Sequence, residues 1–273
     1  MDGQPDYEAE YDNRGRVPEH PAIFAGWARD AAAWREAAPP ETVAYGPGVR
    51  NAVDLFPAGP GPVVLFVHGG YWQAMDRGLF SHMARGLNLR GASVGVVGYD
   101  LCPEVTLGEI VEQVRAACRA MWLRTGERLV VSGHSAGGHL AACMLASDWR
   151  GEAEIGVELV PAAYSISGLF DLRPLLQTRL NGALGLTAEE ADRLSPMLWA
   201  PPDCLALDAV VGEAESAEFH RQSREIVDTW GKDGVSARYG TVQGANHFTA
   251  IAPLADPRSA MVGRILELRA QAA

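Results

Sequence analysis

The sequence predicts an α/β fold in which a mostly parallel central sheet carries helices on both faces. Two observations predict it. Short apolar runs typical of fully buried strands recur along the chain, and amphipathic helical patterns separate them. Such alternation favours right-handed crossovers between parallel strands. In a sheet of this kind, reactive groups gather at the carboxyl ends of the strands.

The chain is expected to form one domain over residues 1–273. Strands are predicted at residues 52–56, 63–67, 93–99, 129–131, 163–167, 205–211 and 235–242. Helices are predicted at residues 23–36, 79–89, 107–124, 217–230 and 259–268, with another after residue 136. Residues 1–50 form an N-terminal arm and helix, whose polar first twenty residues wrap the surface or the site entrance. Residues 173–200 are expected to form a cap or pocket wall.

Composition narrows the function classes. The chain has a formal net charge of -11 and a pI of about 5.1, which argues against a nucleic-acid or anionic-membrane partner. No apolar run approaches the ~20 residues that cross a bilayer, and the polar N-terminus is unlike a secretory signal. We therefore expect a cytoplasmic protein acting on a small molecule, with a homodimer left open.

The cysteines indicate neither a disulfide nor a zinc site. Cys102, Cys118, Cys143 and Cys204 lie far apart without a C-x-x-C pair. Cys118 and Cys143 fall in helical patterns, where a thiol packs as a small apolar side chain. We expect no metal and no cofactor.

The stretch from Leu129 to Leu145 predicts a catalytic serine. A buried strand leads into Gly133-His134-Ser135-Ala136-Gly137, and an Ala- and Leu-rich helix follows. A G-x-S-x-G sequence in this setting is typical of a nucleophile elbow, which holds the serine in a strained conformation at the tip of the turn. Ser135 is therefore the candidate nucleophile, although an ordinary glycine-rich loop has a similar sequence.

The stretch His68-Gly69-Gly70-Tyr71-Trp72 follows the strand at 63–67. Two glycines there let backbone N–H groups face outward, as in an oxyanion hole beside a nucleophile elbow. We expect the oxyanion donors to come from Gly69, Gly70 and Ala136. His68 is expected to hold the loop by hydrogen bonds.

The base and the acid are expected after the last two strands, because Ser, acid, His is the chain order of α/β hydrolases. His247 lies in a polar loop after the last strand and is the candidate general base. Spacing alone does not determine which carboxylate is the acid, and Glu213 and Glu215 fit about equally well. Other carboxylates also qualify, namely Glu218, Asp208 and Asp171.

Five stretches carry a resemblance to a known family. They are HGGYW at 68–72, YDLCPE at 99–104, GHSAGGHLAA at 133–142, SGLFDLRPLL at 167–176 and EFHRQS at 218–223. Together they resemble the kynurenine formamidases, α/β hydrolases related to the hormone-sensitive-lipase group of esterases. The resemblance runs from about Val63 to Phe248 and implies a Ser135, His247, Glu215 triad. The family's animal members usually carry Asp at the acid position, which leaves Glu213 as the fallback.

The resemblance implies hydrolysis of an aryl formamide, with N-formylkynurenine the substrate. Four aromatic side chains are candidates for stacking on the aryl ring, and packing in the core is the alternative for each of them; they are Tyr71, Trp72, Phe170 and Trp199. Tyr71 and Trp72 are favoured because they adjoin the predicted oxyanion loop. Two alternatives stay open: a carboxylesterase for short acyl esters, and a catalytically silent binding protein on the same scaffold.

Overall fold

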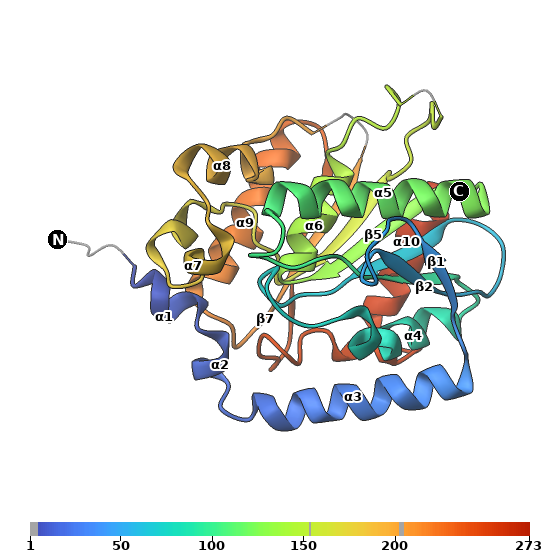
Figure 1. Cartoon of the computed structure of the whole chain (residues 1–273), viewed down its shortest axis with the longest axis horizontal. Helices are drawn as coiled ribbons and strands as arrows, with labels where there is room; N and C mark the ends of the chain where they lie inside the picture. The colour runs from blue at the N-terminus through green and yellow to red at the C-terminus, as the bar shows by residue number, and fades with distance from the viewer. Residues whose placement is uncertain (1–4, 153, 202–204) are drawn as a thin grey trace.

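The chain folds around an eight-stranded sheet in a computed structural model that describes residues 5–152, 154–201 and 205–273 (Figure 1). In sheet order the strands are β1 (Glu41–Ala44), β2 (Ala52–Phe56), β4 (Val94–Val97), β3 (Val63–Val67), β5 (Leu129–His134), β6 (Ala162–Ile166), β7 (Ala206–Gly212) and β8 (Ser236–Val242). The six strands from β3 to β8 pair in parallel, whereas β2 is antiparallel to both of its neighbours, which confirms the mostly parallel sheet.

The central strands are apolar because helices cover both faces of the sheet. Every residue of β3, Val-Val-Leu-Phe-Val, is buried, as is every residue of β5. Continuous apolar runs of this kind are typical of strands buried on both sides. Val67 at the end of β3 lies opposite Gly133 in β5. This register brings the loops that follow the two strands to the same edge of the sheet.

Two apolar cores flank the sheet. Helices α5, α6 and α9 contribute to one core, and α3, η1 and α10 contribute to the other (Figure 1). The helices and 3₁₀ segments are α1 (Tyr7–Tyr11), α2 (Asn13–Arg16), α3 (His20–Ala37), η1 (Arg77–Ala84), α4 (Arg85–Asn88), α5 (Leu107–Thr125), α6 (Ala136–Leu145), η2 (Arg173–Gln177), α7 (Asn181–Leu184), α8 (Ala188–Arg193), η3 (Pro196–Leu198), α9 (Ala217–Lys232), η4 (Ala252–Ala255) and α10 (Ala260–Ala272).

Most predicted elements are confirmed within a few residues, and the differences lie in the first ninety residues. The single helix predicted at 79–89 is wrong: the segment is 3₁₀ over Arg77–Ala84 and α-helical only over Arg85–Asn88. Strand β1 and the short helices α1 and α2 were not predicted. Their few residues carry no periodicity strong enough to identify them.

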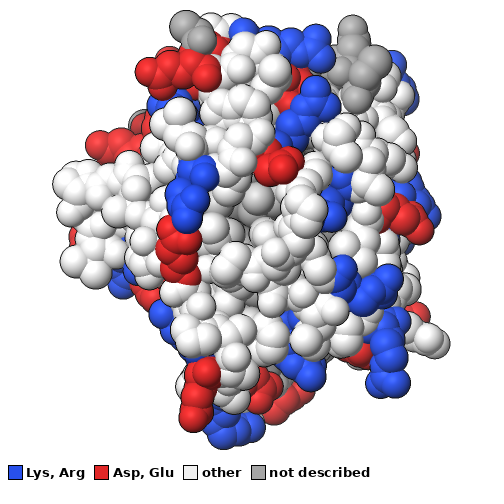
Figure 2. Space-filling view, turned by 90° about the vertical axis from the view of Figure 1, so that its right-hand side faces the viewer, with Lys and Arg blue, Asp and Glu red and all other residues white. Residues whose placement is uncertain are grey.

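Acidic and basic side chains are interspersed on the face shown in Figure 2. Cys118 and Cys143 are fully buried in α5 and α6, as expected of thiols that pack as apolar groups, and Cys204 lies outside the described residues. Across the described ranges, no helix has both the length and the apolar character needed to span a bilayer.

Candidate active site

Ser135 occupies a sharp turn between β5 and α6. Its φ of 56° and ψ of -118° place its backbone in a region that residues other than glycine rarely adopt. The turn is held by main-chain bonds: the Ser135 N–H donates to Ile166 O at 2.8 Å, and the Gly138 N–H donates to Ser135 O at 2.8 Å. The strand, turn and helix expected of a nucleophile elbow are therefore present.

The two glycines of the elbow allow main-chain segments to touch. A Cβ at Gly133 would lie 2.0 Å from Gly137 O, and one at Gly137 would lie 1.9 Å from Val67 O. Real Cβ atoms never approach backbone oxygens this closely, so only glycine fits either position. Through the contact of Gly137 with Val67, the elbow packs directly against the end of β3.

The loop after β3 packs directly on the serine. A Cβ at Gly69 would lie 3.0 Å from Ser135 Cβ, and Gly70 has a positive φ of 113°. His68 is fully buried beneath this loop and donates from Nδ1 to Gly69 O at 2.7 Å. Burial lowers the pKa of His68 to about 4, so this ring is neutral. As the first residue of α6, Ala136 has an amide with no acceptor within its helix.

His247 is oriented by Glu215. The His247 Nδ1–H donates to Glu215 Oε2 at 2.6 Å, and the Glu215 side chain is fully buried. The other carboxylate oxygen, Oε1, accepts from Ser167 Oγ and from the Gly212 N–H, both at 2.6 Å. Hydrogen bonds of this kind offset part of the cost of removing a carboxylate from water. The bond at Nδ1 leaves Nε2 as the imidazole atom free to exchange a proton.

The other carboxylates considered for the acid have separate partners. Glu213 accepts from the Gly244 N–H at 2.7 Å, and Asp208 binds Arg264 through both oxygens. Asp171 is paired with Arg173, and Glu218 with Arg221. None of these four is hydrogen-bonded to His247, whereas Glu215 is.

His134 connects the serine with the loop of His247. Its Nε2–H donates to His247 O at 2.8 Å, and the two rings lie 4.8 Å apart. Burial lowers the pKa of His134 well below its usual value, and the nearby His247 adds to this effect. The Ser135 hydroxyl makes no hydrogen bond to the His247 ring in this structure, although both residues line one cavity. Catalytic hydrogen bonds are often long before substrate binds.

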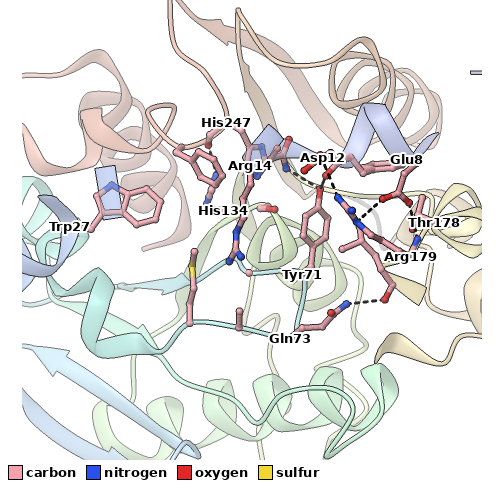
Figure 3. Close-up of a pocket in the computed structure, with 18 residues that line it drawn as sticks. Glu8, Asp12, Arg14, Trp27, Tyr71, Gln73, His134, Thr178, Arg179 and His247 are labelled. Atoms are coloured by element: carbon pink, nitrogen blue, oxygen red, sulfur yellow. Dashed lines mark hydrogen bonds and ion pairs between the residues drawn. The ribbon is translucent and has the colours of Figure 1, made fainter. Parts of the chain in front are cut away.

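The cavity above Ser135 has a volume of about 400 Å³. Its wall includes His134, Ser135 and His247 together with residues 178–180 and the segment formed by α1 and α2 (Figure 3). The complete lining is Glu8, Tyr11, Asp12, Asn13, Arg14, Trp27, Gly70, Tyr71, Gln73, Ala74, Met75, His134, Ser135, Thr178, Arg179, Leu180, His247 and Phe248. This size is within the range of small-molecule sites.

Of the four aromatic residues expected at the cavity, the structure places only Tyr71 there. Tyr71 and Trp72 both have positive φ, and the turn directs Tyr71 to the cavity and Trp72 into the core, where it is fully buried. Phe170 is also fully buried in the core. Trp199 packs against that core and donates from Nε1 to Arg193 O. The expectation for these three residues is therefore corrected, and Tyr11, Trp27 and Phe248 are aromatic wall residues that it missed.

The α1–α2 segment (residues 7–16) is held in place by the EFHRQS stretch. The Tyr11 hydroxyl donates to Glu218 Oε1 at 2.8 Å and accepts from Gln222 Nε2 at 2.6 Å. Gln222 Oε1 also accepts the backbone N–H of Asp171 at 2.8 Å. Glu218 and Gln222 thus fix a cavity wall that lies more than two hundred residues away in the sequence. Sequence reasoning missed these roles, and Ser167 as well, because the partners are remote.

The comparisons with known proteins agree with this geometry. A family model described as the alpha/beta hydrolase fold matches residues 64–250. The kynurenine formamidase of Danio rerio is 30% identical over 237 residues, which cover 83% of this chain and 80% of the fish protein. The chain belongs to the kynurenine formamidase family of α/β hydrolases. As a member of this family it is a hydrolase.

Two solved structures extend the family comparison. A protein from Silicibacter sp. tm1040 with a provisional thioesterase name is 34% identical, with a TM-score of 0.87 over 96% of this chain and 100% of that chain. A bacterial esterase of the hormone-sensitive lipase family has a TM-score of 0.69 at 20% identity, covering 94% of this chain and 99% of its own. At that identity, the likeness to the esterase concerns the fold alone.

Replacing Gly137 with alanine tests the elbow contact. Because the new Cβ would lie 1.9 Å from Val67 O, Gly137→Ala should lower the free energy of unfolding by about 4 kcal/mol or prevent folding. Gly263→Ala in α10 is the matched control, since its Cβ meets nothing within 4 Å. It should stabilise the protein by about 0.5–1 kcal/mol. Urea unfolding measures both, and equal stabilities of the two variants would contradict the packing described.

Proposed function

We propose that this hydrolase cleaves the formyl amide of an aryl formamide, with N-formylkynurenine as the substrate and kynurenine and formate as products. The observation that carries the proposal is the bond from His247 Nδ1 to the buried Glu215, beside a cavity that also contains the strained Ser135. In a triad of this type the serine is nucleophile, the histidine is general base and the acid fixes the histidine tautomer.

In the first step, Ser135 Oγ attacks the formyl carbon while His247 Nε2 takes the hydroxyl proton. The C–O bond formed turns the carbonyl oxygen into an oxyanion. Backbone N–H groups of Gly70 and Ala136 are the proposed donors to it, with Gly69 shaping the loop. Each such donor typically contributes about 3 kcal/mol to stabilising the transition state.

In the second step, His247 returns the proton to the aryl nitrogen as the C–N bond breaks. The aniline leaves and Ser135 retains the formyl group as an ester. Water then attacks this ester, His247 takes its proton and gives it to Ser135 Oγ, and formate leaves. An aryl amine is a better leaving group than an alkyl amine, which suits amide cleavage on this scaffold.

The walls of the cavity support an aromatic substrate. The side chains of Tyr11, Trp27, Tyr71 and Phe248 line it. Burial raises the pKa of the Tyr71 phenol well above its usual value, and the nearby Glu215 raises it further, so this ring is uncharged. The kynurenine formamidase relatives support the same substrate class.

Ser135→Ala tests the nucleophile. The variant should retain its fold and lose turnover of N-formylkynurenine by about 10⁶-fold in kcat, as expected when a triad serine is removed. Formate release measures the rate, and circular dichroism checks the fold. Turnover at the wild-type rate would rule out the assignment.

Substrate preference separates the formamidase from a short-chain carboxylesterase. The wild-type enzyme should have a higher kcat/KM for N-formylkynurenine than for a short-chain aryl ester. A preference for the ester by orders of magnitude would replace the formamidase with the esterase. Failure of the purified protein to react with a serine-directed fluorophosphonate would instead favour a silent binding protein.

A pair of glutamate variants tests the acid. Glu215→Gln should lower kcat by about 10⁴-fold, because an amide at this position favours the wrong tautomer of His247. Glu213→Gln is the matched control, since an amide oxygen can still accept from the Gly244 N–H and the side chain has no contact with His247. It should leave kcat unchanged. Equal losses in the two variants would contradict the assignment of Glu215.

A further inference from the structure

We propose that Arg14 binds a carboxylate on the substrate and thereby makes the enzyme selective for aryl acyl compounds that carry a carboxylate. This inference rests on the proposed function, because it assigns the polar end of the same cavity. Arg14 belongs to α2 and lines the cavity together with Ser135 and His247. Figure 3 shows its side chain reaching from α2 into the space between His134 and Tyr71.

The two acidic side chains of the cavity wall are already paired. Glu8 Oε1 lies 2.7 Å from Arg179 Nε, and Glu8 Oε2 accepts the Arg179 backbone N–H at 2.8 Å. Asp12 Oδ1 accepts the Gly15 N–H at 3.0 Å, and its Oδ2 lies 3.4 Å from Arg179 Nη2. Every oxygen of these two carboxylates therefore has a donor. Arg179, the second cation of the wall, is committed to both of them.

Arg14 has no such partner in the part of the chain that the structure describes. No carboxylate of the described residues lies within ion-pair distance of its guanidinium, and its Cζ lies 6.0 Å from the centre of the Phe24 ring. Phe24 packs edge-on against Phe248, which lines the cavity, with ring centres 5.0 Å apart. The Phe24 ring thus faces the cation, and none of the guanidinium N–H donors is hydrogen-bonded to a residue that the structure describes. A guanidinium with free donors matches the two oxygens of a carboxylate.

Neighbouring polar groups of the wall are engaged within the protein. The Tyr71 hydroxyl donates to Tyr11 O at 2.8 Å and accepts from Asn13 Nδ2 at 2.9 Å. The Thr178 hydroxyl donates to Leu175 O, and Gln73 Nε2 donates to Leu180 O. Among the residues of the wall, this leaves Arg14 as the cation that can form an ion pair with an anionic group of the ligand. N-formylkynurenine carries a carboxylate, next to an α-ammonium, at the end of the side chain that is ortho to its formamide. We therefore assign its formyl group to Ser135 and its carboxylate to Arg14.

A matched pair of esters tests the charge selectivity without depending on the formamide. The substrates are 4-acetoxybenzoate, which is anionic, and 4-acetoxybenzamide, which is neutral and of nearly equal size. Arg14→Gln should raise the KM for the anionic ester by about tenfold, with kcat and the kinetics of the neutral ester unchanged. Arg14→Lys should recover part of the loss, since it keeps the charge without the planar fork.

Arg16→Gln is the control on the same helix. Arg16 pairs with Glu10 at 3.0 Å and is absent from the cavity wall, so its loss should change neither ester. Equal losses for the anionic and the neutral ester in Arg14→Gln would overturn the inference. The same loss in Arg16→Gln as in Arg14→Gln would also overturn it, because both would then act through the position of α2.

Binding of intact substrate gives a second readout that does not need turnover. By isothermal titration calorimetry, Ser135→Ala should bind N-formylkynurenine, and Ser135→Ala/Arg14→Gln should bind it about tenfold more weakly. Equal Kd values would overturn the role of Arg14, whereas no measurable binding to Ser135→Ala would count against N-formylkynurenine as the substrate. Absence of hydrolysis in the wild-type enzyme would instead overturn the proposed function, and the two failures are therefore distinguishable.

Discussion

The backbone contact between Gly137 and Val67 is the constraint on which the site depends. Because no side chain intervenes, the start of α6 lies directly on the end of β3, and Gly69 lies directly beside Ser135. The spacing between the serine, the glycine loop and the free amide of Ala136 is thus set by main-chain atoms. Main-chain positions vary less than side-chain rotamers, so groups placed this way need little reorganisation when charge develops.

The buried carboxylate of Glu215 shows how the rest of the sheet supports that constraint. It receives hydrogen bonds from Ser167 after β6, from Gly212 at the end of β7 and from His247 after β8. Ser167 itself has a positive φ of 54°, held by its N–H bond to Val210 O. Strained residues of this kind persist where the surrounding structure over-determines them. Three adjacent strands therefore fix one imidazole.

The sequence alone predicted the parts of the molecule that local patterns determine. The buried strands, the long helices, the elbow and the glycine loop all follow from short contiguous signals, and so did the position of His247. Spacing could not separate Glu213 from Glu215, because the turn after β7 decides which carboxylate faces inward. Trp72 was wrongly expected at the cavity, since neighbouring residues of a turn point in opposite directions. The α1–α2 segment was beyond prediction in detail because its partners, such as Glu218, are remote.

Two separate parts of the chain form the cavity: the edge of the sheet, and the α1–α2 segment that is attached to α9. The groups that would carry the chemistry belong to the sheet edge, whereas Tyr11 and Arg14 come from a short stretch tied on by a few hydrogen bonds. Changes in this stretch can retune which molecules enter while the machinery behind it stays intact. For protein engineering, residues 7–16 are accordingly a natural cassette for exchanging ligand preference within this scaffold.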